Sequence, residues 1–146
     1  MEFKVQFFIF YIIADLLMII GWFFPYLYIQ AVGIDTYTWM WGLYYYNSNF
    51  FMLRLSGDTL MMFILAVIVL VLVIINVIAF LMMRKQEDIK IMGILNAIIG
   101  IIILIFIIVP IFGLVFLSGF TPFIGFYLML IGAIIAIIST ILAFRE

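Results

Sequence analysis

Four long apolar stretches dominate the chain and predict four membrane-spanning helices. Each is at least about 20 residues long, as a bilayer crossing requires, and the predicted spans cover residues 3–24, 60–83, 89–111 and 122–144. We expect the third span to end near Pro110, and the fourth to begin with Thr121 as its cap and Pro122 at its first helical position. The 146 residues leave no room for a separate soluble domain. The pattern therefore predicts an all-α integral membrane protein, a four-transmembrane-helix bundle formed by a single domain.

The segment 25–59 has a different pattern, because it is rich in aromatic and β-branched residues and contains turn-forming residues. Gly33-Ile34-Asp35 and Asn47-Ser48-Asn49 separate three candidate strands, which cover residues 26–32, 37–46 and 50–55. The segment therefore predicts a small antiparallel β-sheet, which must rest on the ends of the helices because so small a sheet is marginal alone. The alternative is an irregular aromatic loop that lies among the lipid headgroups.

The basic residues predict the orientation of the chain in the membrane. Five of the six fall on one predicted side, and these are Lys4, Arg84, Lys85, Lys90 and Arg145. Only Arg54 falls on the other side. By the positive-inside rule, both termini and the charged turn 84–90 face the cytoplasm, while the loop 25–59 and the short turn 112–121 face outward.

Composition excludes several classes of function. Hydrophobic residues make up 71% of the chain, against about 45–50% in soluble domains, so the lipid bilayer is its surroundings. The net charge of −1 leaves no basic surface for nucleic acid. The chain has no Cys and no His, and we expect no cofactor and no metal site. The ten methionines are expected to pack as apolar side chains. No pairing of nucleophile and base, glycine-rich phosphate loop or carboxylate pair is present, so we expect no enzyme.

The loop carries Trp39 and then Trp41-Gly42-Leu43-Tyr44, between a first span that ends near a proline and three further spans. This arrangement resembles the claudin and peripheral myelin protein superfamily. In that family the first outer loop holds a tryptophan, a Gly-Leu-Trp motif and two cysteines on a small antiparallel sheet above four helices. Here both cysteines are missing and Tyr44 stands in place of the motif tryptophan. The resemblance implies a structural, adhesive or accessory role without catalysis.

The aromatic residues of the loop are candidates for contact with a partner, since aromatic side chains are enriched at protein interfaces. The partner would be another copy of the chain or another membrane-protein subunit. The candidate contact residues are Trp39, Trp41, Gly42, Leu43, Tyr44, Tyr45, Tyr46, Phe50 and Phe51. The alternative is that they contact only lipid headgroups.

Asp15 is the only acidic residue inside a predicted span. A carboxylate at mid-membrane costs about 2.5–3.5 kcal/mol, so it should face the bundle interior, be protonated or meet a hydrogen-bond donor. One hypothesis makes Asp15 the site of a small ion or proton conductor, and the other makes it a neutral packing residue. Counted from the cytoplasmic end of its own span, Asp15 lies about 18 Å deep.

Asn76, Asn96, Ser139 and Thr140 lie about 8–11 Å from the cytoplasmic ends of their spans and form a predicted polar layer. We expect Asp15 to lie too far above this layer for direct contact. The layer indicates hydrogen bonds between helices, and the alternative is a water-filled vestibule.

Small residues recur on the third and fourth spans at helical spacing, which indicates close helix packing inside the bundle. An alternative is that one stripe faces another subunit. The two stripes are Gly93, Ala97 and Gly100, and then Gly125, Gly132, Ala136, Ser139 and Ala143.

Overall fold

The structure is a computed structural model, and it describes most of the backbone and the side chains of the helices. The backbone is described for residues 2–31, 34–41, 43–46, 50–53, 58–85, 89–118 and 121–145. Side chains are described for residues 4–30, 35–41, 60–85, 89–109 and 121–145. The elements follow in the order α1 (Glu2–Phe23), β1 (Leu27–Ala31), β2 (Ile34–Thr38), β3 (Leu43–Tyr46), β4 (Phe50–Leu53), α2 (Asp58–Met83), α3 (Lys90–Ser118), β5 (Thr121–Pro122) and α4 (Ile124–Arg145).

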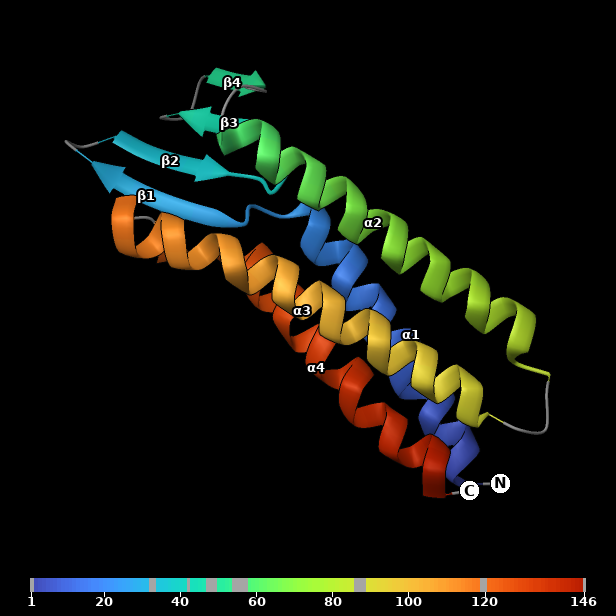
Figure 1. Cartoon of the computed structure of the whole chain (residues 1–146). Coiled ribbons are helices and arrows are strands. Elements are labelled where there is room, and N and C mark those ends of the chain that lie inside the picture. Colours follow the sequence, from blue (N-terminus) through green and yellow to red (C-terminus); the bar gives the residue numbers. More distant parts are fainter. Residues whose placement is uncertain are drawn as a thin grey trace.

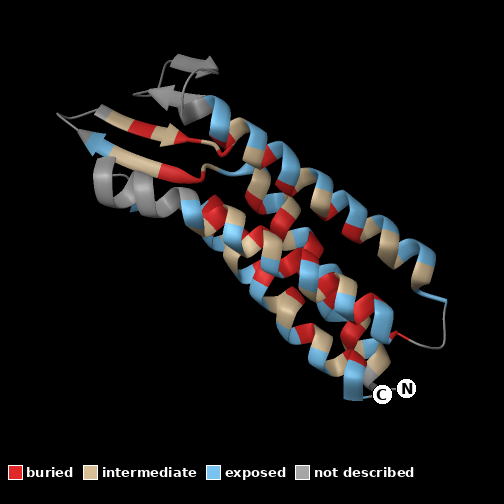
Figure 2. Ribbon diagram, in the orientation of Figure 1, coloured by how far each residue is buried: buried red, intermediate tan, exposed pale blue. Residues whose placement is uncertain are grey.

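All four helices are long and apolar enough to cross a membrane, which confirms the prediction of a four-helix integral membrane protein with a small antiparallel sheet. Their apolar segments are Lys4–Phe23, Leu60–Met83, Lys90–Val109 and Ile124–Arg145. The helices lie side by side, with the sheet at one end and the two ends of the chain together at the other (Figure 1). Buried residues concentrate where the helices face one another, and exposed apolar residues cover the outside (Figure 2).

The most extensive contact joins α1 and α4, and α4 also packs along α3. Glycine makes the first of these contacts close. A Cβ atom added at Gly125 would lie 2.5 Å from the Phe24 carbonyl oxygen and 2.7 Å from that of Pro25. One added at Gly132 would lie 2.9 Å from the Ala14 carbonyl oxygen. Both positions on α4 therefore require glycine because the backbone of the α1 segment leaves no space.

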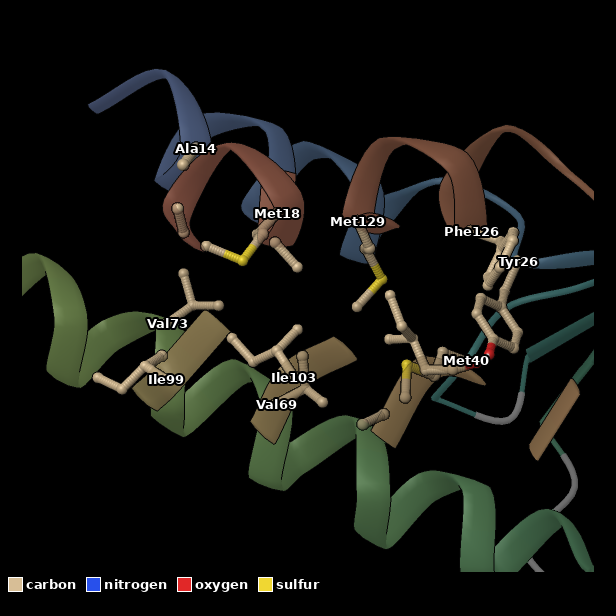
Figure 3. Packing of buried hydrophobic residues seen from close by; sticks show 14 of the residues in the cluster. Ala14, Met18, Tyr26, Met40, Val69, Val73, Ile99, Ile103, Phe126 and Met129 are labelled. Atoms are coloured by element: carbon tan, nitrogen blue, oxygen red, sulfur yellow. Dashed lines mark hydrogen bonds between the residues drawn. The ribbon is translucent and has the colours of Figure 1, made fainter. Parts of the chain in front are cut away.

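Large apolar side chains from all four helices fill the centre of the bundle (Figure 3). Met18 of α1 and Met129 of α4 point toward Val69 of α2 and Ile103 of α3. Each flexible thioether side chain lies against a glycine of the other helix, since a Cβ atom added at Gly132 would be 2.8 Å from Met18 Cγ and one added at Gly21 would be 2.7 Å from Met129 Cγ. Methionine therefore serves as packing material here, at positions that are fully buried.

Within the described backbone, the sheet has five strands in the order β4-β3-β2-β1-β5, and each neighbouring pair is antiparallel. The prediction of one strand over residues 37–46 was wrong, because this stretch contributes to both β2 and β3. The chain leaves the sheet between them to place Trp39 and Trp41 against the end of α1, where their indole groups donate hydrogen bonds. The first reversal also comes earlier than predicted, since Ala31 pairs with Ile34.

The predicted ends of two helices were also wrong. Helix α3 continues through Pro110 to Ser118, well beyond the predicted end near residue 111, so the predicted turn 112–121 is mostly helix. A proline removes one backbone donor, but ending the helix inside the bilayer would leave more backbone groups without partners. Thr121 and Pro122 pair with Tyr28 and Leu27 as strand β5, and α4 begins at Ile124.

Candidate functional site

The centre of the bundle contains a buried hydrogen-bond network around Asn76 of α2. Its side-chain oxygen accepts a hydrogen bond from the Tyr11 hydroxyl at 2.6 Å. Its amide nitrogen donates to Asp15 Oδ1 at 2.7 Å and to Asn96 Oδ1 at 2.9 Å. Both amide hydrogens and the carbonyl oxygen of Asn76 are therefore used, and one side chain connects three helices.

Asn96 of α3 extends the network to α4. Its amide nitrogen donates to Ser139 Oγ and to the Ala136 carbonyl oxygen, both at 3.0 Å. The Ser139 hydroxyl in turn donates to the Ala136 carbonyl oxygen at 2.9 Å. The network consequently links all four helices through side chains, with Tyr11 and Asp15 on α1, Asn76 on α2, Asn96 on α3 and Ser139 on α4.

A fourth residue of the predicted polar layer, Thr140, makes a separate contact. Its hydroxyl donates to the Gly93 carbonyl oxygen at 2.9 Å and to that of Ala136 at 3.2 Å. Because a Cβ atom added at Gly93 would lie 2.7 Å from Ala143 Cβ, the two helices are already in close contact at this level. Thr140 therefore joins α3 to α4 at a second point.

The network is shielded from its surroundings. Tyr11, Asn76 and Asn96 are fully buried, and Asp15 and Ser139 are 5% and 2% exposed. Burying polar groups in an apolar interior costs free energy unless each finds a partner. The residues satisfy one another, so the arrangement can hold the four helices in a fixed register.

The prediction that Asp15 lies too far from the polar layer was wrong, as its hydrogen bond to Asn76 shows. The error came from counting depth from the end of each helix. Asp15 lies 13 residues from the start of α1 and Asn76 lies seven from the end of α2, a difference of about 9 Å at 1.5 Å per residue. The helix ends are not level, so α1 extends past the end of α2.

The small residues of the two predicted stripes lie between helices. Gly93 and Gly100 face Ala143 and Ala136 on α4, whereas Gly125 and Gly132 face α1. Ala136 and Ala143 are buried and Ala97 is half-buried. Within the part of the chain whose side chains are described, these stripes thus contact neighbouring helices of the same chain.

Two of the candidate contact residues in the loop are used within the chain. Trp41 Nε1 donates to the Trp22 carbonyl oxygen at 3.2 Å, and Trp39 Nε1 donates to that of Phe23 at 2.9 Å. The last carbonyl groups of a helix have no partner within it, so these indoles cap α1. Trp41 also stacks on Trp22 with ring centroids 5.8 Å apart. Both tryptophans therefore attach the sheet to the first helix.

The other candidate contact residues are known only by their backbone or lie outside the described residues. Gly42 belongs to the second group. Leu43 to Tyr46 form β3, and Phe50 and Phe51 begin β4, with Tyr45 opposite Phe51 and Tyr46 opposite Phe50. Their contact with a partner stays a prediction.

Sequence reasoning missed two tyrosines that organise this region. Tyr11 lies four residues before Asp15, and this spacing on a helix places both on one face, which is the signal that could have found it. Tyr26 is fully buried and its hydroxyl donates to the Ile107 carbonyl oxygen of α3. Since a tyrosine beside a predicted interface looks like a headgroup contact, the sequence carries no clear signal for this bond.

The electrostatics of the sheet region follow from burial and one hydrogen bond. Burial raises the pKa of Tyr26 above its usual value. The hydrogen bond from Tyr28 to Asp35, 2.8 Å long, raises the pKa of Tyr28. Among the described residues, no three His, Cys, Asp or Glu side chains form a group that could hold a metal ion.

The chemistry available to the network is therefore that of hydrogen bonding, with Asp15 as its one carboxyl group.

A comparison of the chain with models of known protein families and with curated proteins found no match.

Proposed function

We propose that this protein is a non-enzymatic membrane scaffold or accessory subunit, which contacts a partner protein through the β3–β4 hairpin of its sheet. The observation that carries the proposal is the strand order, in which β4 is the edge strand farthest from β1 and β5. The sheet is attached to the helices at two places. At the β1 and β5 side, the Phe123 and Gly125 amides donate to the Tyr26 and Pro25 carbonyl oxygens, and between β2 and β3 the indoles of Trp39 and Trp41 cap α1. The hairpin is the part left for a partner.

The composition of the hairpin supports contact with another protein. All eight strand residues, Leu43 to Tyr46 and Phe50 to Leu53, are hydrophobic or aromatic. An edge strand also has backbone donors and acceptors on its outer side, which a strand from a second chain can pair with. We infer that a second copy or another membrane subunit covers this edge.

The buried network supports a scaffold more than a conductor. A conducting path needs polar groups that are free to exchange protons or ions, whereas the amides of Asn76 and Asn96 are fully engaged with other members of the network. An interior held in this way favours a rigid bundle that presents the sheet. A claudin-like structural or adhesive role is consistent with such a design.

The test uses the double variant Tyr45→Ala/Phe51→Ala, which alters a cross-strand pair of the hairpin and no residue of α1. Tyr127→Ala is the matched control, since Tyr127 is an exposed aromatic residue on α4. The tagged protein is extracted from its own membrane in mild detergent, and the mass of the extracted complex is measured. We expect a complex larger than 17.0 kDa for the wild type and the control, and a monomer for the double variant.

Two results would contradict the proposal: a wild type that is extracted as a folded monomer, or a folded double variant whose complex is unchanged. Trp39 and Trp41 are unsuitable probes because their indoles cap α1, so their removal would disturb the attachment of the sheet.

The second candidate is a small ion or proton conductor, and the carboxyl group of Asp15 inside the bundle favours it. Asp15→Asn keeps the shape of the side chain and removes its charge, so it should abolish any flux into liposomes. A wild type that conducts neither protons nor cations would exclude this function, and a flux that persists in Asp15→Asn would exclude Asp15 as its site.

A further inference from the structure

A groove on the outside of the bundle runs along α4 toward its end. It has a volume of about 350 Å³ and is lined by Phe10 of α1 together with residues of α4, namely Ile135, Ile138, Ser139, Ile141, Leu142 and Arg145. Phe10, Ile138 and Ile141 are each about half exposed. The groove is thus open to the surroundings of the helices, which for spans of this kind are lipid chains.

Two residues of the groove lining are polar, Ser139 partway along it and Arg145 at its end. Ser139 is engaged by Asn96 and by the Ala136 carbonyl oxygen. Arg145, the last residue of α4, is the single charged residue in the lining and is exposed. An apolar floor with one guanidinium at its end matches a ligand that has an apolar chain and an anionic head.

The length of the groove matches one leaflet of a membrane. From Ile135 to Arg145, α4 rises about 15 Å at 1.5 Å per residue. This is half of the hydrocarbon thickness of about 30 Å. A lipid chain that begins beside Arg145 would therefore reach the middle of the bilayer beside Ile135.

We propose that this groove binds an anionic phospholipid, with one acyl chain along Ile135, Ile138 and Leu142 and its phosphate against the Arg145 guanidinium. A guanidinium can donate two parallel hydrogen bonds to phosphate oxygens, which suits it to this headgroup better than a point charge. The site lies toward the end of α4 that is opposite the sheet (Figure 1), so it is independent of the partner contact proposed above.

The experiment is a competition between two lipids with identical dioleoyl chains, phosphatidylglycerol and phosphatidylcholine, added in equal amounts to the detergent-solubilised protein. Native mass spectrometry measures the ratio of the two bound forms. We expect roughly a fivefold preference for phosphatidylglycerol, the effect of one basic residue near an anionic surface. Arg145→Gln should reduce the ratio to about one, and Ile138→Trp, which fills the groove, should lower the amount of both bound lipids.

Arg84→Gln is the matched control, because Arg84 is an exposed basic residue beyond the end of α2 and outside the groove. It should keep the wild-type ratio, and glycerol 3-phosphate, a headgroup without chains, should fail to displace the lipid. The proposal is overturned by equal binding of both lipids to the wild type, by an unchanged ratio in Arg145→Gln, by an equal loss in Arg84→Gln, or by displacement with glycerol 3-phosphate.

Discussion

The amide nitrogen of Asn76 lies 2.7 Å from Oδ1 of Asp15, across 61 residues of sequence and between two helices. Asp15 is the single carboxyl group within the four apolar helical segments, and this hydrogen bond gives it a donor. The core of a bilayer contains no water that could donate instead. The same amide group holds Asn96 on a third helix. Asn76 is therefore the residue whose removal should affect the bundle most.

We expect Asn76→Leu to lower the free energy of unfolding by about 1–3 kcal/mol, because it leaves buried polar groups of Asp15 and Asn96 without their partner. Ser139→Ala should cost less, about 0.6 kcal/mol, because Asn96 keeps its bond to the Ala136 carbonyl oxygen. Reversible unfolding in mixed micelles, followed by tryptophan fluorescence, measures both. Ile75→Ala, at an exposed position of α2, is the control. A variant Asn76→Leu as stable as the wild type would contradict a supporting role for the network.

Gly125→Ala should destabilise the contact between α1 and α4 by about 1–3 kcal/mol, the usual cost of overpacking. The added methyl group would meet the backbone carbonyl oxygens of Phe24 and Pro25, which cannot move aside as a side chain can. Thermal unfolding in detergent measures the effect, with Ile131→Ala at an exposed position of the same helix as the control. An unchanged midpoint for Gly125→Ala would show that the two helices can separate without loss of stability.

The buried hydroxyl of Tyr26 should make the protein less stable at alkaline pH. Burial raises the pKa of Tyr26 in the folded chain, whereas in the unfolded chain it ionises at about pH 10. Above pH 10 the folded state therefore binds more protons than the unfolded state. The contribution of Tyr26 to the free energy of unfolding is complete below pH 10 and decreases as the pH rises above it. The unfolding midpoint of the wild type minus that of Tyr26→Phe should therefore decrease between pH 10 and 12. A difference that stays constant from pH 8 to 12 would contradict the prediction.

The orientation predicted from the basic residues can be tested because the chain has no cysteine. Gln30 in β1 and Lys85 after α2 are both exposed. In intact cells, a membrane-impermeant maleimide should label Gln30→Cys, and it should label Lys85→Cys only after lysis. The cysteine-free wild type is the control, and the reverse pattern would place the sheet on the cytoplasmic side.

The sequence predicts the helices well because each span is a long apolar run, and no other element gives that pattern. It predicts their ends poorly. Pro110 is a helix breaker in water, yet α3 passes through it to Ser118. Thr121 and Pro122 are residue types typical of a helix start. They form a strand instead, because they pair with the edge of β1 and the Thr121 hydroxyl donates to the Tyr28 carbonyl oxygen. These outcomes depend on tertiary contacts that a local pattern does not contain.

Most residues of the candidate site were predictable from sequence, but their contacts were not. Polar residues inside apolar spans identify Asp15, Asn76 and Asn96 from sequence alone, but which of them touch depends on how far each helix is shifted along the bundle. The tryptophans show the converse case. Trp39 and Trp41 are residue types common at protein interfaces. In the structure their indoles donate to the last carbonyl oxygens of α1 and attach the sheet to that helix.

The pairing of α1 with α4 has a consequence for how the protein is made. The first of the four helices to leave the ribosome finds its main neighbour in the last, and Asp15 meets Asn76 only after a further 61 residues have been synthesised. Until α2 has been synthesised, the carboxyl group of Asp15 lacks this partner. Assembly of the bundle is therefore a late event in the synthesis of these helices. In a chain stopped before α4, the surface of α1 that Gly125 and Gly132 normally cover would stay exposed to the quality-control machinery.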